Sequence, residues 1–106
     1  MYDIHLIERN AQFRRVEGTT DEWITGNWKA GRDGVKAENI VGGNVYLHIY
    51  QKGICYFGGQ ILQTKYVGPD RIEIRFRFDN SVIGTIATGS WGQEQCLVKR
   101  EGQASG

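Results

Sequence analysis

The segment Asn44–Phe78 constrains the fold most, because two stretches within it alternate apolar and polar side chains. In Asn44–Gln51, Val45, Leu47 and Ile49 fall on one face of an extended chain. In Arg71–Phe78 the alternation has no error, and the apolar positions are Ile72, Ile74, Phe76 and Phe78. A period of two residues is typical of a β-strand with one buried face. The chain is therefore predicted to be mainly β.

Glycines shape the remaining strands. Ile54–Val67 is predicted to be a long strand interrupted at Gly58 and Gly59, a pair typical of a bulge or a barrel corner. Fifteen glycines against one proline fit tight turns well and long helices poorly. Further strands are predicted at Tyr2–Glu8, Val82–Ala87 and Gln95–Lys99. We expect about six strands that close into a small antiparallel β-barrel, because closure removes exposed strand edges.

Three segments have weaker patterns. Asn10–Glu17 fits a short helix or a strand. Gly18–Ile24 has a helix-start signal, since Thr19 or Thr20 could cap a turn that begins with acidic residues. Gly26–Gly43 is predicted to be a long irregular loop, and such loops are often functional. One or two short helices are thus the most that we expect.

Length and charge bound the class of protein. The chain has 106 residues, so we expect one domain over residues 1–101 and a disordered tail over 102–106. A net charge of +1 argues against non-specific coating of nucleic acid and leaves room for a local basic patch. No apolar run approaches the roughly 20 residues of a spanning helix. The first residues lack signal-peptide features, so we expect a cytoplasmic protein with no membrane partner.

Catalytic and metal-binding patterns are missing from the sequence. His5 and His48 are the only histidines, and each lies in the middle of a predicted strand with no nucleophile motif nearby. Cys55 and Cys96 lie in strand-like segments, where thiols are more often buried and reduced than paired. No metal-ligand spacing, phosphate loop or dinucleotide motif occurs. We expect no catalytic residues, no metal and no cofactor.

Aromatic and basic residues carry the functional prediction. Trp28 is flanked by Asn27, Lys29 and Arg32, residue types that stack on a planar ligand and bond its edge. The alternative is that the aromatic side chains only close the ends of the barrel. Three aromatic or histidine side chains share the polar face of one predicted strand, namely Tyr46, His48 and Tyr50.

Basic residues also follow one face of the strand Arg71–Phe78. Arg71, Arg75 and Arg77 are interrupted by Glu73. This pattern fits an ordinary solvated face. It also fits a stripe that tracks phosphates together with residues elsewhere in the chain, namely Lys65, Lys29, Arg32 and Lys36.

Three short motifs resemble the PUA-like group, especially the EVE and ASCH domains. The motifs are Trp28–Arg32, Val41–Leu47 and Ile54–Ile61, and the resemblance covers Ile24–Phe78. Asn44 stands where that group usually has Asp. The resemblance implies a pseudo-barrel that holds a flipped, often modified, nucleobase. It also implies that Trp28 forms a wall, that Arg32 contacts a phosphate or base edge, and that Gly58 and Gly59 allow close backbone approach.

The leading prediction is a non-enzymatic module that binds nucleic acid or a modified nucleobase in an aromatic pocket. The predicted ligand-binding residues are Trp28, Tyr46, His48, Tyr50, Gly58 and Gly59, and the predicted phosphate contacts are Lys29, Arg32 and Lys36. One alternative is a barrel that binds a planar or apolar small molecule. Another is a homodimeric protein–protein adaptor with Trp23 and Trp91 as interface anchors.

Overall fold

The computed structural model describes residues 1–100, so the tail expected over 102–106 lies outside the described residues. The chain forms one seven-stranded sheet, which confirms the mainly β prediction. The strands are β1 (Tyr2–Ile7), β2 (Phe13–Arg15), β3 (Glu22–Lys29), β4 (Asn44–His48), β5 (Cys55–Tyr66), β6 (Arg71–Phe78) and β7 (Gln95–Lys99). The helices within residues 1–100 are short 3₁₀ turns, namely η1 (Arg32–Gly34), η2 (Ala37–Ile40) and η3 (Asn80–Val82).

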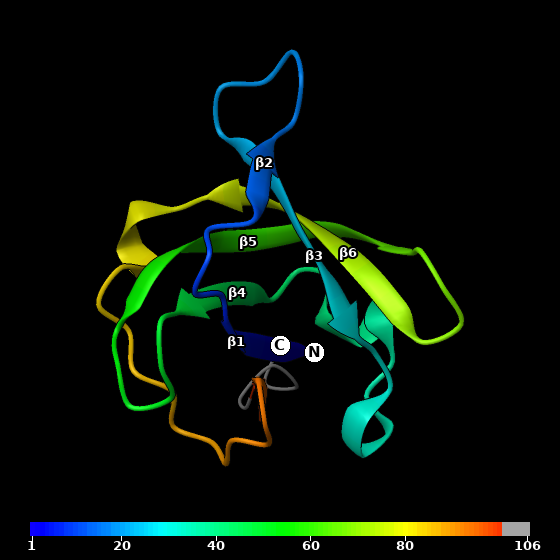
Figure 1. Ribbon diagram of the computed structural model, residues 1–106, viewed down its shortest axis with the longest axis vertical. Helices are drawn as coiled ribbons and strands as arrows, with labels where there is room; N and C mark the ends of the chain where they lie inside the picture. Colours follow the sequence, from blue (N-terminus) through cyan, green and yellow to red (C-terminus); the bar gives the residue numbers. More distant parts are fainter. Residues whose placement is uncertain (101–106) are drawn as a thin grey trace, which may run out of the picture.

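The sheet is strongly curved but open. Its strand order is β2-β3-β6-β5-β4-β1-β7, and β2 and β7 at its two ends do not pair with each other in the described part of the chain. Closure into a barrel is therefore not observed. One pair, β1 with β4, is parallel, which departs from the antiparallel prediction. Figure 1 shows the curvature and the hairpin of β2 and β3 projecting from the rest of the molecule.

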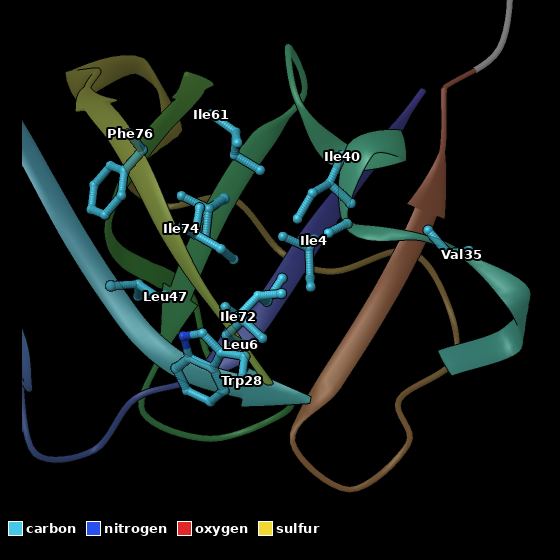
Figure 2. Close-up of a cluster of buried hydrophobic side chains, with 12 residues drawn as sticks. Ile4, Leu6, Trp28, Val35, Ile40, Leu47, Ile61, Ile72, Ile74 and Phe76 are labelled. Atoms are coloured by element: carbon cyan, nitrogen blue, oxygen red, sulfur yellow. The ribbon is translucent and has the colours of Figure 1, made fainter. Parts of the chain in front are cut away.

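The core lies on the face of the sheet that the apolar positions of the alternating segment Arg71–Phe78 predicted. Ile72, Ile74 and Phe76 are buried as predicted. The other buried apolar residues around them include Ile4, Leu6, Leu47 and Ile61 (Figure 2). Val45 belongs to the same cluster. Ile49 was predicted to join them but is 46% exposed, because β4 ends at His48, just after a register shift. No described helix is long and apolar enough to cross a membrane.

Gly58 and Gly59 lie inside β5 and let neighbouring strands approach closely. A Cβ atom on Gly58 would lie 2.1 Å from the carbonyl oxygen of Val45 in β4. A Cβ atom on Gly59 would lie 1.7 Å from the carbonyl oxygen of Arg77 in β6. The space beside both glycines is thus filled by the backbone of the adjacent strands.

Three local predictions are wrong. The helix start at Gly18–Ile24 is absent, since β3 begins at Glu22 and the Thr19 hydroxyl instead donates to the carbonyl oxygen of Val16 at 2.7 Å. The strand predicted at Val82–Ala87 is replaced by η3 and a connection without regular structure. The loop predicted from Gly26 begins only after Lys29, because β3 continues through that point by pairing with β6.

Candidate functional site

A bulge in β3 decides which side chains reach the site. The register between β3 and β6 shifts between Gly26 and Trp28, so that one extra residue, Asn27, changes the phase of the strand. Trp28 consequently faces the core opposite Ile72 and is 7% exposed. Its indole N–H donates to the Thr25 hydroxyl at 3.2 Å. Most of this ring and its polar edge are therefore engaged within the protein.

The same bulge places two cations directly opposite each other. Lys29 pairs with Arg71 at the end of the β3–β6 ladder. Like charges in directly opposed positions of a sheet are destabilising. Neither side chain forms an ion pair with a residue within 1–100. Positive charge thus accumulates without compensation at this end of the two strands.

The other arginines of β6 are compensated. Arg75 donates through Nε to Oε1 of Glu22 at 2.7 Å. Arg77 lies 3.7 Å, Nε to Oδ2, from Asp21. Of the arginine stripe that the sequence suggested, Arg71 is therefore the member that keeps its charge available for a ligand.

A pocket of about 600 Å³ opens beside Lys29 and Arg71. Its lining comes from the end of β3 and the following turn, from the start of β6, and from the segment that enters β7. The lining residues are Trp28, Lys29, Ala30, Gly31, Arg32, Arg71, Gly92, Gln93, Glu94 and Gln95. Three of these side chains are cationic and one is acidic. The volume falls within the roughly 300–1,000 Å³ of small-ligand sites.

This pocket lies at the seam between the two sides of the open sheet. Arg32 Nη1 donates to the carbonyl oxygen of Gln95 at 2.8 Å, and Gln95 Nε2 donates to the carbonyl oxygen of Lys29 at 2.6 Å. Side chains thus connect the end of β3 to the start of β7, which lie close together in Figure 2. Gly92 leaves room for this arrangement, since a Cβ atom there would lie 1.6 Å from Arg32 Nη1.

A second cluster lies on the opposite face of the sheet from the core. His48 Nδ1 is 2.9 Å from the carbonyl oxygen of Gly53, which can only accept, so the proton lies on Nδ1. His48 Nε2 therefore accepts from His5 Nδ1, at 2.8 Å. Tyr46 stacks on His5 with ring centroids 4.4 Å apart. Trp91 packs edge-on against both histidines, with its centroid 5.5 Å from His48 and 6.1 Å from His5.

Burial keeps the histidine pair neutral. Desolvation, followed by repulsion from His48, lowers the pKa of His5 to about 4, although Asp3 acts in the opposite direction. Burial also lowers the pKa of His48, and its hydrogen bond to Gly53 partly offsets this effect. The pair can take up a proton only at a cost in free energy.

The structure brings together some predicted site residues and separates others. Trp28, Lys29 and Arg32 meet in the pocket. Lys36 is exposed and borders a smaller hollow of about 20 Å³ beside it. The other predicted ligand-binding residues lie elsewhere. Tyr46 and His48 belong to the histidine cluster. Tyr50 is exposed on the turn after β4, and Gly58 and Gly59 are buried between strands.

The two remaining tryptophans are half-buried. Trp23 lies in β3, edge-on to Phe57 at 5.2 Å, and the Arg15 guanidinium lies over its ring at 5.0 Å. Trp91 covers the histidine pair. Their suggested role as interface anchors stays a prediction.

Sequence reasoning missed part of the site. The segment Gly92–Gln95 carries no motif, and its place beside Lys29 depends on long-range packing. His5 was not predicted as a partner of His48, because nothing in the spacing shows that β1 and β4 are neighbours. Among residues 1–100, no group of three or more His, Cys, Asp or Glu side chains is arranged to hold a metal ion. Comparisons of the chain with protein-family models, curated proteins and solved structures find no match.

Proposed function

We propose that this protein is a non-enzymatic module that binds single-stranded nucleic acid through the pocket at the seam between β3 and β7. The opposed pair of Lys29 and Arg71 carries the proposal. A bound phosphate relieves the repulsion between these cations and adds charge-assisted hydrogen bonds. Arg32, in the turn after β3, lines the same pocket and provides a third cation, and its Nε also lies 3.6 Å from Oδ2 of Asp33.

The size of the pocket favours a single strand over a duplex. About 600 Å³ accommodates a nucleotide unit, whereas a rigid duplex needs a basic surface that extends along its backbone. The ion pairs of Arg75 and Arg77 with Glu22 and Asp21 interrupt any such extended surface. In this proposal the base enters toward Trp28 and the phosphates lie near Lys29 and Arg71.

We further propose that the curved sheet is a PUA-like pseudo-barrel. Its two sides approach each other at the seam, where the hydrogen bonds of Arg32 and Gln95 replace a backbone ladder. The resemblance over Ile24–Phe78 supports this assignment, and a nucleobase-binding role agrees with it.

Binding of a fluorescein-labelled oligothymidine, followed by anisotropy at low salt, tests the function. Lys29→Gln and Arg71→Gln should each weaken binding roughly fivefold, since an exposed ion pair contributes up to about 1 kcal/mol. Lys52→Gln is the matched control, because it removes one exposed charge outside the pocket lining. Trp28→Ala is unsuitable, since emptying a buried tryptophan site costs about 3–5 kcal/mol of stability.

Two results would reject the proposal. One is the absence of binding at low salt. The other is an equal loss of affinity in Lys52→Gln and Lys29→Gln, which would mean that only net charge matters. Salt-insensitive binding of a planar compound, with no response to the oligonucleotide, would favour a small-molecule site instead.

A further inference from the structure

The wall of the pocket formed by Gly92–Gln95 is held at Gln95 by Arg32 and Lys29, and along the rest of its length from the side of the histidine cluster. Gln51, in the turn after β4, donates to the carbonyl oxygens of Gly92 and Gln93, both at 3.0 Å. The backbone N–H of Ile7 in β1 donates to the carbonyl oxygen of Glu94 at 3.0 Å. The part of the wall before Gln95 is therefore tied to β1 and to the turn after β4.

Trp91 joins this wall to the histidine pair. It directly precedes Gly92, and its ring packs edge-on against both His5 and His48. Gln51 follows His48 closely in the chain. The carbonyl oxygen of Gly53, which closes the same turn, accepts a hydrogen bond from Nδ1 of His48. The two histidines thus contact Trp91, which precedes the wall, and the turn after β4, which carries Gln51.

The direction of the hydrogen bonds fixes where a proton would go. Gly53 accepts from His48, and His48 accepts from His5, so the unprotonated nitrogen of the pair is Nε2 of His5. This atom makes no hydrogen bond with a residue in the described part of the chain. No buried side-chain nitrogen within residues 1–100 lacks a hydrogen-bond partner, so Nε2 of His5 keeps some access to water. Tyr46 stacks on the ring and Trp91 packs edge-on to it, so a cation formed there is only partly hydrated and gains hydration if the tryptophan moves away.

We propose that His5 and His48 are positioning residues, which hold the pocket wall through Trp91 and release it when His5 is protonated. The part of this inference that concerns ligand affinity rests on the proposed function, whereas the release of the wall does not. A ligand that needs the closed wall then binds less tightly, in proportion to the fraction of molecules whose wall is closed.

Charged and titratable groups surround the histidine pair. Asp3 on β1 favours protonation of His5, and burial opposes it. The other titratable or charged groups packed nearby are Tyr46 on β4, Cys55 on β5, Cys96 on β7, Arg100 directly after β7, and Arg32 beside Cys96. Burial raises the pKa values of Tyr46, Cys55 and Cys96, and the hydrogen bond to Asp3 raises the pKa of Arg100.

Other groups in the pocket predict a different effect of acid. Protonation of Glu94 in the lining would strengthen the binding of an anion, because it removes a negative charge. Weaker binding at acid pH therefore has the sign that release of the wall predicts and the opposite sign to titration of Glu94.

The experiment compares the protein with His5→Asn, whose amide can still donate to His48 but does not titrate. Both proteins also carry Glu94→Gln, so that protonation of a carboxylate at position 94 cannot change the wall signals. Without ligand, the amide NMR signals of Gly92–Gln95 should shift together with the His5 imidazole signals, and should stay constant in His5→Asn. With labelled oligothymidine, affinity should be about threefold lower near pH 3.5 than near pH 7, because most His5 side chains are protonated only below their pKa of about 4, and only in the protein that keeps His5.

Further variants keep the test decisive. Tyr46→Phe preserves the stacking on His5 and should retain the pH response. Trp91→Ala, at a half-buried loop position, should uncouple the wall signals from the imidazole titration if His5→Asn does not fold. The inference would be overturned if the amide signals of Gly92–Gln95 stayed constant while the His5 imidazole titrates. It would also be overturned if His5→Asn kept the pH response of the parent protein. Failure of oligothymidine to bind at any pH would reject the proposed function, while the ligand-free NMR comparison would still decide the release of the wall.

Discussion

At the scale of the residue, the Lys29–Arg71 pair links stability to binding. Opposed cations on neighbouring strands cost free energy in the unliganded protein, and a bound anion removes that cost. Two opposed cations without a carboxylate partner add nothing to stability, whereas β6 itself shows the compensated arrangement in the ion pair of Arg75 with Glu22. This contrast is the reason for placing the proposed site at this end of the strand.

Lys29→Glu should therefore move stability and affinity in opposite directions. The new carboxylate would face Arg71 and should raise the free energy of unfolding by about 0.2–1 kcal/mol. Affinity for oligothymidine should fall at the same time, because a cation of the pocket becomes an anion. Urea unfolding and anisotropy measure the two quantities. A destabilised variant would contradict the role of the opposed charges.

Gly92 provides a second prediction at this scale. Gly92→Ala should displace the Arg32 guanidinium, which is the mobile end of a long side chain, and break its bond to the Gln95 carbonyl. Loss of one such hydrogen bond costs about 1 kcal/mol of stability and should weaken oligothymidine binding. Gly68→Ala is the control, since its added methyl group meets nothing closer than 3.6 Å. Equal behaviour of the two variants would exclude Arg32 from the site.

At the scale of the element, the hydrogen bond between His5 and His48 joins the parallel strands β1 and β4. The pKa of His5 falls from 6.5 to about 4 on folding, so the folded state favours the neutral form. The stabilisation is complete above the pKa of the unfolded state and is lost as the pH falls from 6.5 toward 4. The free energy of unfolding should drop by about 2 kcal/mol between about pH 7 and pH 5.

Denaturant unfolding at several pH values checks this prediction. In His5→Asn the same acid step should have a much smaller effect, whatever the stability of that variant at neutral pH. Tyr46→Phe should keep the dependence of the parent protein, because it leaves both imidazoles in place. A similar drop in stability with and without His5 would assign the acid sensitivity to other groups.

The elements also show what a sequence can and cannot reveal. The alternation in Arg71–Phe78 is local, and it correctly predicted a strand and its buried face. The helix signal at Gly18–Ile24 is local too, but pairing of β3 with β6 outweighs it. Gly26 and Asn27 read as the start of a loop, because a bulge inside a strand uses the same residue types as a turn.

At the scale of the whole molecule, the site arises where the curved sheet fails to close. The predicted basic loop around Trp28 does line the pocket, but its opposite wall comes from Gly92–Gln95. Neither that wall nor the Lys29–Arg71 register is encoded in a short pattern, since both depend on how distant strands are ordered. The sequence could therefore predict the cations of one side of the pocket and not the geometry that brings them together.

The salt dependence of oligothymidine binding tests the central claim most directly. For single strands, the slope of log K against log salt concentration is about −0.7 for each phosphate neutralised, so three pocket cations predict a slope of about −2. The double variant Lys29→Gln/Arg71→Gln should reduce the slope to about −0.7, whereas Lys52→Gln should leave it unchanged. A slope near zero in the parent protein, or the same slope in the double variant, would contradict the proposed phosphate-binding pocket.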